Sequence, residues 1–328
     1  MAADRLAVIL TGVGKRYDIV SAFALHAFTI AADPNPLAPA QYAADLRVAP
    51  PPFTSDEYVP FLQELVREHD VRAVVPLTDL DIEILGRAEL PAFVPPPDVA
   101  RATFDKWEAH ELLLSHGLPS PPTVLPGDEP SSYPVVVKPR RGSGARSIHV
   151  AANREQAEFF ARYVDEPVMV QKQLAGPHFS VDLICDMNGR CLNAIPRSML
   201  ESRGGESIKG KVTRDPELIE LGVRLGESLG VRGPCTFQVF NDPDVGIAIY
   251  DVNTRFGGAF PAHMYAARPG RTYPELVVRM AAGETVEPHV GDFEDGMTFT
   301  RYFWHLELDG QLRPTGRDAV EGGPRPPR

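Results

Sequence analysis

The sequence predicts a mixed fold, in which an α/β unit built on a parallel sheet precedes an α+β body. Over residues 1–98 strand-like apolar runs alternate with helix-like amphipathic runs, a pattern typical of a parallel sheet with helices on its faces. From residue 134 onward, strand-like runs follow one another with few helices between them, as in antiparallel sheets. Proline-rich connectors at 95–97 and 118–130 separate these parts and should hold them at fixed offsets.

The first unit has the periodicity of three strands and two helices. Apolar runs predict strands at 6–10, 28–33 and 71–77, and amphipathic stretches predict helices at 17–28 and 59–69. Ligands of open parallel sheets bind at the carboxyl ends of the strands, here residues 11–14, Asp33 and 78–81. Gly12-x-Gly14 lacks the third glycine of a dinucleotide fingerprint, because Tyr17 stands there. A nicotinamide-dependent oxidoreductase is an alternative that rests on these glycines alone.

The later elements predict two further subdomains and a tail. We expect one helix over 103–117 that ends at Gly117, a strand pair at 134–139 and 146–150, a helix at 153–163 and a strand at 167–172. Further strands, a helix near 216–229 and a hairpin over 237–252 complete the body. The expected units are therefore 1–98, 99–166 and 167–315, followed by a mobile tail at 316–328.

Composition excludes several classes of function. The net charge is −11, without a long basic run, which argues against nucleic-acid and anionic-membrane partners. Apolar stretches end well before the ~18 residues of a membrane span, and the N-terminus shows no export signal. Cys185, Cys191 and Cys235 fit neither a metal motif nor a disulfide framework, so we expect a cytoplasmic protein.

A glycine-rich loop follows the β-rich run that ends at Lys138, and it carries Gly142, Ser143, Gly144 and Ser147. Glycines let backbone N–H groups turn toward a phosphate, and the lysine adds a point charge for its oxygens. Taken alone, such a hairpin is more often just a tight turn. The loop is therefore a candidate phosphate site that needs support from other residues.

The strand at 167–172 runs into a polar segment with Gln171, Lys172, Leu174 and His178. Backbone groups exposed at the end of a strand are able to hydrogen-bond the edge of an adenine, and His178 to bond a ribose hydroxyl. The alternative is a surface loop with an incidental histidine.

The segment 237–261 carries the strongest signal. Two strand-like runs flank a turn, so that Gln238 and Asp251 fall on neighbouring strands. The two-residue period of a strand puts Asp251, Asn253 and Arg255 on one face. A carboxylate and two amides suit Mg²⁺, which takes few protein ligands and keeps phosphate oxygens and waters, and the guanidinium would reach the same phosphates.

In this order of motifs the chain resembles the ATP-grasp superfamily over nearly its full length. The likeness is greatest to the branch of the carbamoyl phosphate synthetase large subunit and biotin carboxylase, and to short amino-acid and pyrrolysine-type ligases. Gln171 stands where the family more often has an acid, and Asp251 where it has a bridging Glu. The residues that match family motifs are 11–14, Asp105-Lys106, Lys138, 171–174, His178, Gln238, Asp251, Asn253 and Arg255.

The resemblance implies an ATP-grasp fold with an N-terminal pre-ATP-grasp domain and an ADP-forming ligase that joins a carboxylate to an amine. ATP and Mg²⁺, or Mn²⁺ in its place, would be bound; the substrates would be amino-acid or peptide-like small molecules, and the family habit is a homodimer. Lys106 and Lys138 would neutralise the nucleotide phosphates, and Arg255 the transferred group. Arg197 and Arg203, with the loop 204–211, would close over the acyl phosphate. A carboxy-phosphate-forming enzyme and a non-catalytic nucleotide-binding protein are the alternatives.

Overall fold

Three β-sheets organise the chain, and the first is a parallel sheet near the N-terminus. The computed structural model describes residues 5–142, 144, 146–258, 262–302 and 305–316. In the first sheet β1 (Ala7–Thr11) lies between β2 (Phe28–Ala32) and β4 (Val71–Pro76), with β3 (Leu46–Val48) at the edge beside β2. Every residue of β1 is buried, as expected of a strand covered by helices on both faces.

Alternate residues of β1 pack into different cores because successive side chains point to opposite faces. Ile9 packs in the core that contains Leu62 of α2 (Tyr58–Glu68). Val8 and Leu10 pack in the core that contains Phe23 of α1 (Tyr17–Ala24). The short helices η1 (Pro39–Ala43) and α3 (Ile82–Arg87) complete this unit.

A six-stranded antiparallel sheet forms the body, in the order β13-β12-β9-β10-β11-β14. One of its faces is apolar, and Val181, Leu183 and Phe237 share a core with α7 (Pro216–Ser228). Gly222 permits the close approach of this helix, since a Cβ there would lie 2.8 Å from the Cβ of Ala194. The strands are β9 (His178–Cys185), β10 (Cys191–Arg203), β11 (Glu206–Val212), β12 (Gly233–Asp242), β13 (Gly246–Asn253) and β14 (Thr298–Thr300).

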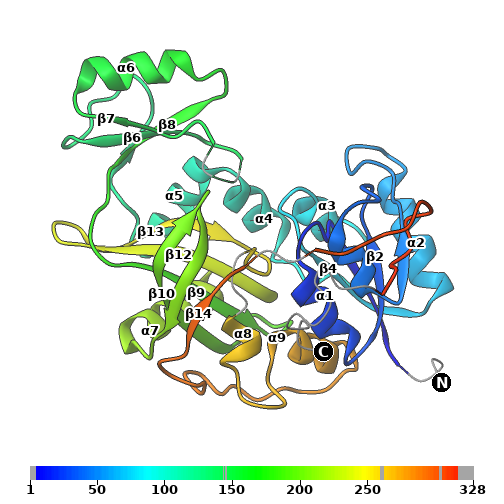
Figure 1. Cartoon of the computed structure of the whole chain (residues 1–328). Coiled ribbons are helices and arrows are strands. Elements are labelled where there is room, and N and C mark those ends of the chain that lie inside the picture. The colour runs from blue at the N-terminus through cyan, green and yellow to red at the C-terminus, as the bar shows by residue number, and fades with distance from the viewer. Residues whose placement is uncertain (1–4, 143, 145, 259–261, 303–304, 317–328) are drawn as a thin grey trace.

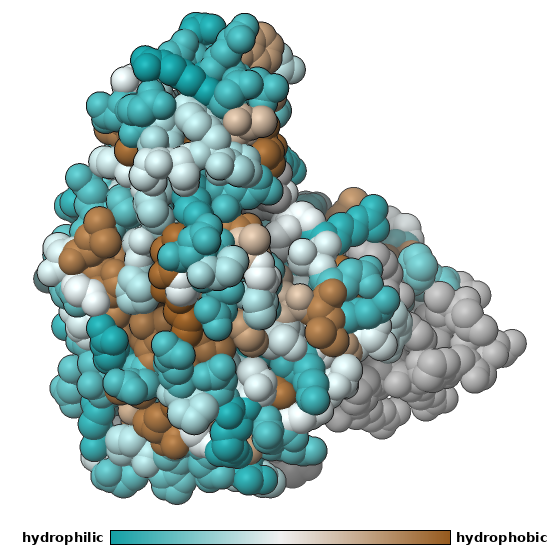
Figure 2. Space-filling model, turned by 90° about the vertical axis from the view of Figure 1, so that its left-hand side faces the viewer, coloured by the Kyte–Doolittle hydropathy of each residue, from teal (hydrophilic) through white to brown (hydrophobic). Residues whose placement is uncertain are grey.

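A small lobe carries the third sheet, in the order β5-β8-β6-β7, with α6 (Arg154–Tyr163) packed on it. This lobe stands apart from the body and from the N-terminal unit in Figure 1, and its visible surface in Figure 2 is mostly hydrophilic. Two helices, α4 (Pro97–Phe104) and α5 (Lys106–Ser115), lie between it and the N-terminal unit. Its strands are β5 (Thr123–Val124), β6 (Val135–Pro139), β7 (His149–Ala151) and β8 (Val168–Lys172).

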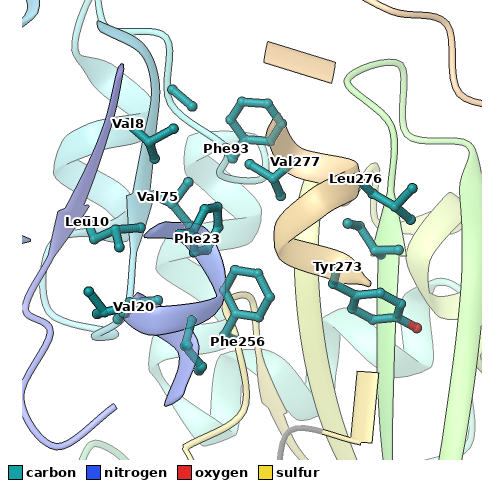
Figure 3. Close-up of a cluster of buried hydrophobic side chains, with 14 of the residues drawn as sticks. Val8, Leu10, Val20, Phe23, Val75, Phe93, Phe256, Tyr273, Leu276 and Val277 are labelled. Carbon is teal, nitrogen blue, oxygen red and sulfur yellow. The ribbon is translucent and has the colours of Figure 1, made fainter. Parts of the chain in front are cut away.

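The N-terminal unit and the body share one hydrophobic core. Phe23 of α1 lies edge-on to Phe256, with ring centroids 5.7 Å apart. Tyr273 and Leu276 of α9 (Tyr273–Ala281) extend the same cluster toward the body, and Figure 3 shows both sets of side chains facing one another. A core that spans the junction holds the carboxyl ends of β1 and β4 against the segment that follows β13.

The predicted strands and helices are confirmed as elements, with two corrections. The single helix expected over 103–117 is two helices, because Asp105 ends α4 and its carboxylate caps α5 by accepting from Trp107 N and Glu108 N. The loop expected over 204–211 is mostly strand β11, paired with β10. Of the tail expected at 316–328, only residue 316 is described. Within the described residues no helix has the length and apolar character to cross a membrane.

Candidate active site

Lys138, at the carboxyl end of β6, is a buried amine with one neutral partner. It is 5% exposed, and its Nζ donates to Gln171 Oε1 at 2.9 Å. Burial, opposed by Asp251 and assisted by Lys106, lowers the pKa of Lys138 to about 8. A lysine held with too little negative charge around it is suited to receive an anion.

Lys106 opens α5 and faces the glycine-rich loop. Its Nζ donates to the carbonyl of Gly142 at 2.7 Å, and its backbone N–H bonds Arg140 O at 2.8 Å. Asp105 fixes this helix start by capping α5 and pairing with Arg140 at 2.9 Å. Gly142 and Gly144 adopt positive φ, and so does Ser147 at 54°, whereas Ser143 lies outside the described residues.

A small cavity lies where these elements meet. Lys106 from α5, Gln171 from β8, and Tyr250 and Asp251 from β13 all line it. Elements far apart in the sequence therefore bring a lysine, an amide and a carboxylate to one cavity. Two of these groups, Lys106 and Asp251, also act electrostatically on Lys138.

The segment expected to bind adenine is only partly arranged for it. Gln171 is buried and donates from Nε2 to Thr123 Oγ1 at 2.9 Å, so its side chain joins Lys138 to β5. The Nζ of Lys172 turns away to Asp244, at 2.8 Å, in the β12–β13 turn. Leu174 follows β8 and is half-buried.

His178 is half-buried against the β12–β13 hairpin. Its ring stacks on Phe240, with centroids 4.2 Å apart, and its Nε2 lies 2.8 Å from the hydroxyl of Tyr250. Burial lowers the pKa of His178 to about 4, so the ring is neutral at physiological pH.

The predicted metal residues lie on one face of the β12–β13 hairpin. Gln238 pairs directly with Asp251 in register, and Asn253 Nδ2 donates to Asp251 Oδ2 at 2.6 Å. No group of three or more His, Cys, Asp or Glu side chains able to hold a metal occurs among the described residues. The set of one carboxylate and two amides nevertheless fits Mg²⁺, which binds oxygen and keeps most of its coordination for waters and phosphate.

Tyr250 is a site residue that the sequence pattern hides. Strict alternation would turn it away from Asp251, but the register shifts between Gln238 and Val239 and leaves Tyr250 as an extra residue. Its hydroxyl consequently donates to Gln238 Oε1. A bulge depends on cross-strand pairing, which a single strand's sequence does not reveal.

Arg255 lies beyond the hairpin and connects it to the N-terminal unit. Its Nη2 donates to Asp79 Oδ2 at 2.7 Å and to Asn253 Oδ1 at 3.0 Å, and Nη1 donates to Phe256 O at 2.8 Å. Asp79 follows β4 of the parallel sheet, and Asn253 ends β13 of the antiparallel sheet. Hydrogen bonds from both sheets therefore fix the position of the guanidinium. Its Nε is buried and has no hydrogen-bond partner among the residues that the structure describes.

Arg197 and Arg203, both expected over the acyl phosphate, lie in different environments. Arg197 is 1% exposed and pairs with Asp182 of the neighbouring strand β9. Arg203 is exposed at the tip of the β10–β11 hairpin. This tip approaches the metal residues, since Gln238 Nε2 donates to Gly205 O at 3.2 Å. The tip of the β10–β11 hairpin therefore lies beside Gln238, but Arg197 and Arg203 do not lie together.

Comparison with known proteins finds that two parts of this chain match known families. Residues 103–259 match the ATP-grasp domain family, and residues 8–92 match the PylC-like N-terminal domain family. The carbamoyl phosphate synthase large chain of Agathobacter rectalis is 29% identical over 212 residues, which are 57% of this chain and 19% of that protein. The chain thus spans about a fifth of that curated relative.

Two solved structures share the fold over most of this chain. Biotin carboxylase from Campylobacter jejuni, in a complex with β,γ-ATP, has a TM-score of 0.72 at 17% identity and covers 95% of this chain and 78% of its own. The L-amino acid ligase of Bacillus licheniformis has a TM-score of 0.66 at 17% identity and covers 89% of this chain and 78% of its own.

Proposed function

Because this chain pairs an ATP-grasp domain with a PylC-like N-terminal domain, we propose that it is an ADP-forming ligase that joins a carboxylate to an amine. The observation that carries the proposal is that Lys106 and Asp251 line one small cavity, while both act electrostatically on the buried amine of Lys138. A nucleotide phosphate chain with its metal would supply the missing negative charge beside the two lysines and a positive charge beside the carboxylate. Both halves of the site are then satisfied together.

Phosphoryl transfer needs positioning and charge neutralisation more than covalent help from the protein. An oxygen of the substrate carboxylate attacks the γ-phosphorus of ATP; an O–P bond forms and the bond to ADP breaks. The amine then attacks the acyl carbon, a C–N bond forms, phosphate leaves with its electron pair, and the amine loses a proton. Mg²⁺ bound by Gln238, Asp251 and Asn253 would neutralise phosphate oxygens.

We assign the remaining residues by where their atoms lie. Lys106 and Lys138 bind the phosphates, with the glycine-rich loop covering them, and Arg255 neutralises the transferred group. Gln171 to Leu174 and His178 border the adenosine, the backbone of the strand end meeting the base. Arg203, at the tip of the β10–β11 hairpin, excludes water from the acyl phosphate, while Arg197 supports the sheet face beneath it. The L-amino acid ligase of similar fold favours amino acids as substrates.

A pairwise amino-acid screen tests the proposal. ADP release is measured for each pair with MgATP, and the product of any active pair is identified by mass spectrometry. We expect ADP release that depends on both partners in the wild type and is lost in Lys138→Met. ADP release from no pair, with nucleotide still bound, would contradict an amino-acid ligase.

A second candidate is a carboxy-phosphate-forming enzyme, which the likeness to the carbamoyl phosphate synthase large chain favours. Here bicarbonate replaces the organic carboxylate at the same phosphates. Bicarbonate-dependent ADP release without any amino acid distinguishes it from the first. In either case we expect a homodimer, measured by light scattering, and a reducing cytoplasm, which suits three free buried cysteines.

A further inference from the structure

Arg16 lies at the junction of the N-terminal unit and the body, and within the described part of the chain its guanidinium has no direct ion-pair partner. It ends the turn between β1 and α1, and its Nε is buried with no hydrogen-bond partner in the described ranges. Among the described residues its guanidinium forms no hydrogen bond or ion pair. A buried guanidinium without a partner is costly, so it is normally paired.

The charged residues around Arg16 are already engaged with one another. Asp79 accepts from Arg255 at 2.7 Å, and Glu206 accepts from Lys15 at 2.8 Å and from Arg301 at 2.9 Å. Burial raises the pKa of the remaining acid, Asp18. Two of the three acids that act on Arg16, Asp79 and Glu206, are therefore already paired with other cations.

The backbone at Gly258 lies close beside this guanidinium. A Cβ at Gly258 would lie 3.2 Å from Arg16 Nη2 and 3.5 Å from Glu206 Oε1, so any side chain would crowd both. Arg16, Glu206 and Gly258 are each half-buried, so each is partly accessible to solvent. Arg16 also lies at the carboxyl ends of β1 and β4, the edge where ligands of parallel sheets bind.

We propose that Arg16 binds a carboxylate of the substrate beside Gly258, next to the Arg255 that serves phosphoryl transfer. The inference rests on the proposed function and names the group that holds its substrate. A guanidinium fork matches a carboxylate in two parallel hydrogen bonds, which would satisfy the orphaned charge. Burial, and then repulsion by Arg255, lower the pKa of Arg16 to about 10, in accord with a site that is short of an anion.

The bound carboxylate has two sources in a carboxylate–amine ligase. One is the carboxylate that becomes phosphorylated, and the other is the carboxylate of the amine-bearing acceptor. Hydroxylamine distinguishes them, because it traps the acyl phosphate as a hydroxamate with release of phosphate and so reports the first half-reaction without the acceptor.

The test compares Arg16→Met and Arg16→Lys with Arg72→Met, a control that removes an exposed arginine of the same unit. For Arg16→Met we expect KM for one amino acid to rise ~10–100-fold, the equivalent of a charged hydrogen bond, with MgADP affinity unchanged. If Arg16→Met raises KM in the hydroxylamine assay, Arg16 binds the carboxylate that becomes phosphorylated. If the variant raises only the KM of the acceptor, Arg16 binds the carboxylate of the amine-bearing acceptor. Gly258→Ala should raise the same KM without changing charge. Unchanged KM for both amino acids overturns the proposal.

A binding readout keeps this test separate from the proposed function. If the wild type releases no ADP with any amino acid, thermal unfolding with sodium succinate, against sodium chloride of equal ionic strength, still tests Arg16. We expect succinate to raise Tm in the wild type and in Arg72→Met, but not in Arg16→Met. Equal behaviour of Arg16→Met and the wild type would overturn the carboxylate site.

Discussion

Arg255 and Asp79 are 176 residues apart in the sequence, yet the Nη2 of the arginine donates to the Oδ2 of the aspartate at 2.7 Å. The pair joins the segment after the β12–β13 hairpin to the segment that follows β4. Because Nη2 also donates to Asn253 Oδ1 at 3.0 Å, one guanidinium aligns a proposed Mg²⁺ ligand with the N-terminal unit. The position of the N-terminal unit thereby bears on the chemistry at the hairpin.

Arg255→Ala should cut turnover by on the order of 10³ and leave nucleotide binding intact, because the lost charge acts mainly on the transferred phosphoryl group. Turnover and MgADP affinity measured side by side check this. Asp79→Asn, which keeps the shape but loses the charge of the partner, should have a smaller effect. Near-normal turnover of the alanine variant would remove Arg255 from the reaction.

Nucleotide binding should take up a proton near pH 8.5. Lys138 has a folded pKa of about 8 against 10.5 for a free lysine, so it is largely neutral there, and nearby phosphates would recharge it. Calorimetry of MgADP binding in buffers of different ionisation enthalpy measures the uptake, which should vanish in Lys138→Met. Equal uptake by both proteins would contradict the assignment.

The same depressed pKa predicts how folding stability depends on pH. Below pH 8 the folded chain carries the unfavourable charge on Lys138, whereas above 10.5 both states are neutral at this residue. The contribution of Lys138 to stability therefore improves as pH rises from 8 to 10.5. Urea unfolding of the wild type relative to Lys138→Met, measured across this window, should show that gain; a loss would refute the sign.

Gln171→Glu should abolish the proton uptake. The new carboxylate would stand within 2.9 Å of the lysine and raise its pKa by ~1–3 units, so that Lys138 is already charged before nucleotide binds. Gln173→Glu, an exposed neighbour, is the matched control and should behave as the wild type. An unchanged uptake in Gln171→Glu would show that the amide does not set the lysine's pKa.

Phe256→Ala should destabilise the protein by about 3–5 kcal/mol, since the ring is 1% exposed and its removal leaves a cavity in the shared core. Urea unfolding measures the loss. Phe159→Ala, whose ring is 53% exposed, should change stability by less than about 1 kcal/mol. Similar losses from both would mean that the junction core does not carry stability.

Local sequence patterns predicted the features of the site that depend on residues close in sequence. They failed for features that depend on the pairing of strands far apart in sequence. The alternation of Asp251 and Asn253 and the predicted turn were enough to place Gln238 and Asp251 on neighbouring strands, and their direct pairing comes from the register shift. Tyr250 was not predicted as a site residue, because the register shift that turns it toward the site depends on pairing with β12. The burial of Arg197 against Asp182 likewise depends on β9 and β10 lying side by side.

Arg16 illustrates the same limit at the level of charge. Its place after a glycine turn was visible in the sequence, but its lack of a direct partner among the described residues was not, because the acids around it come from three separate segments and two of them are already paired. The helix break at Asp105 was hidden for another reason. The residue is a common helix N-cap, yet continuous helical periodicity on both sides masked it.

Transfer of oxygen from the substrate carboxylate to phosphate tests the central claim most directly. The amino acid pair with the highest ADP release is used, with ¹⁸O in both oxygens of the activated carboxylate, and the released phosphate is analysed by mass spectrometry. Attack of that carboxylate on ATP predicts one ¹⁸O in each phosphate, because the acyl C–O bond breaks when the amine adds. Phosphate without ¹⁸O would mean that water attacked ATP, and would contradict the ligase assignment.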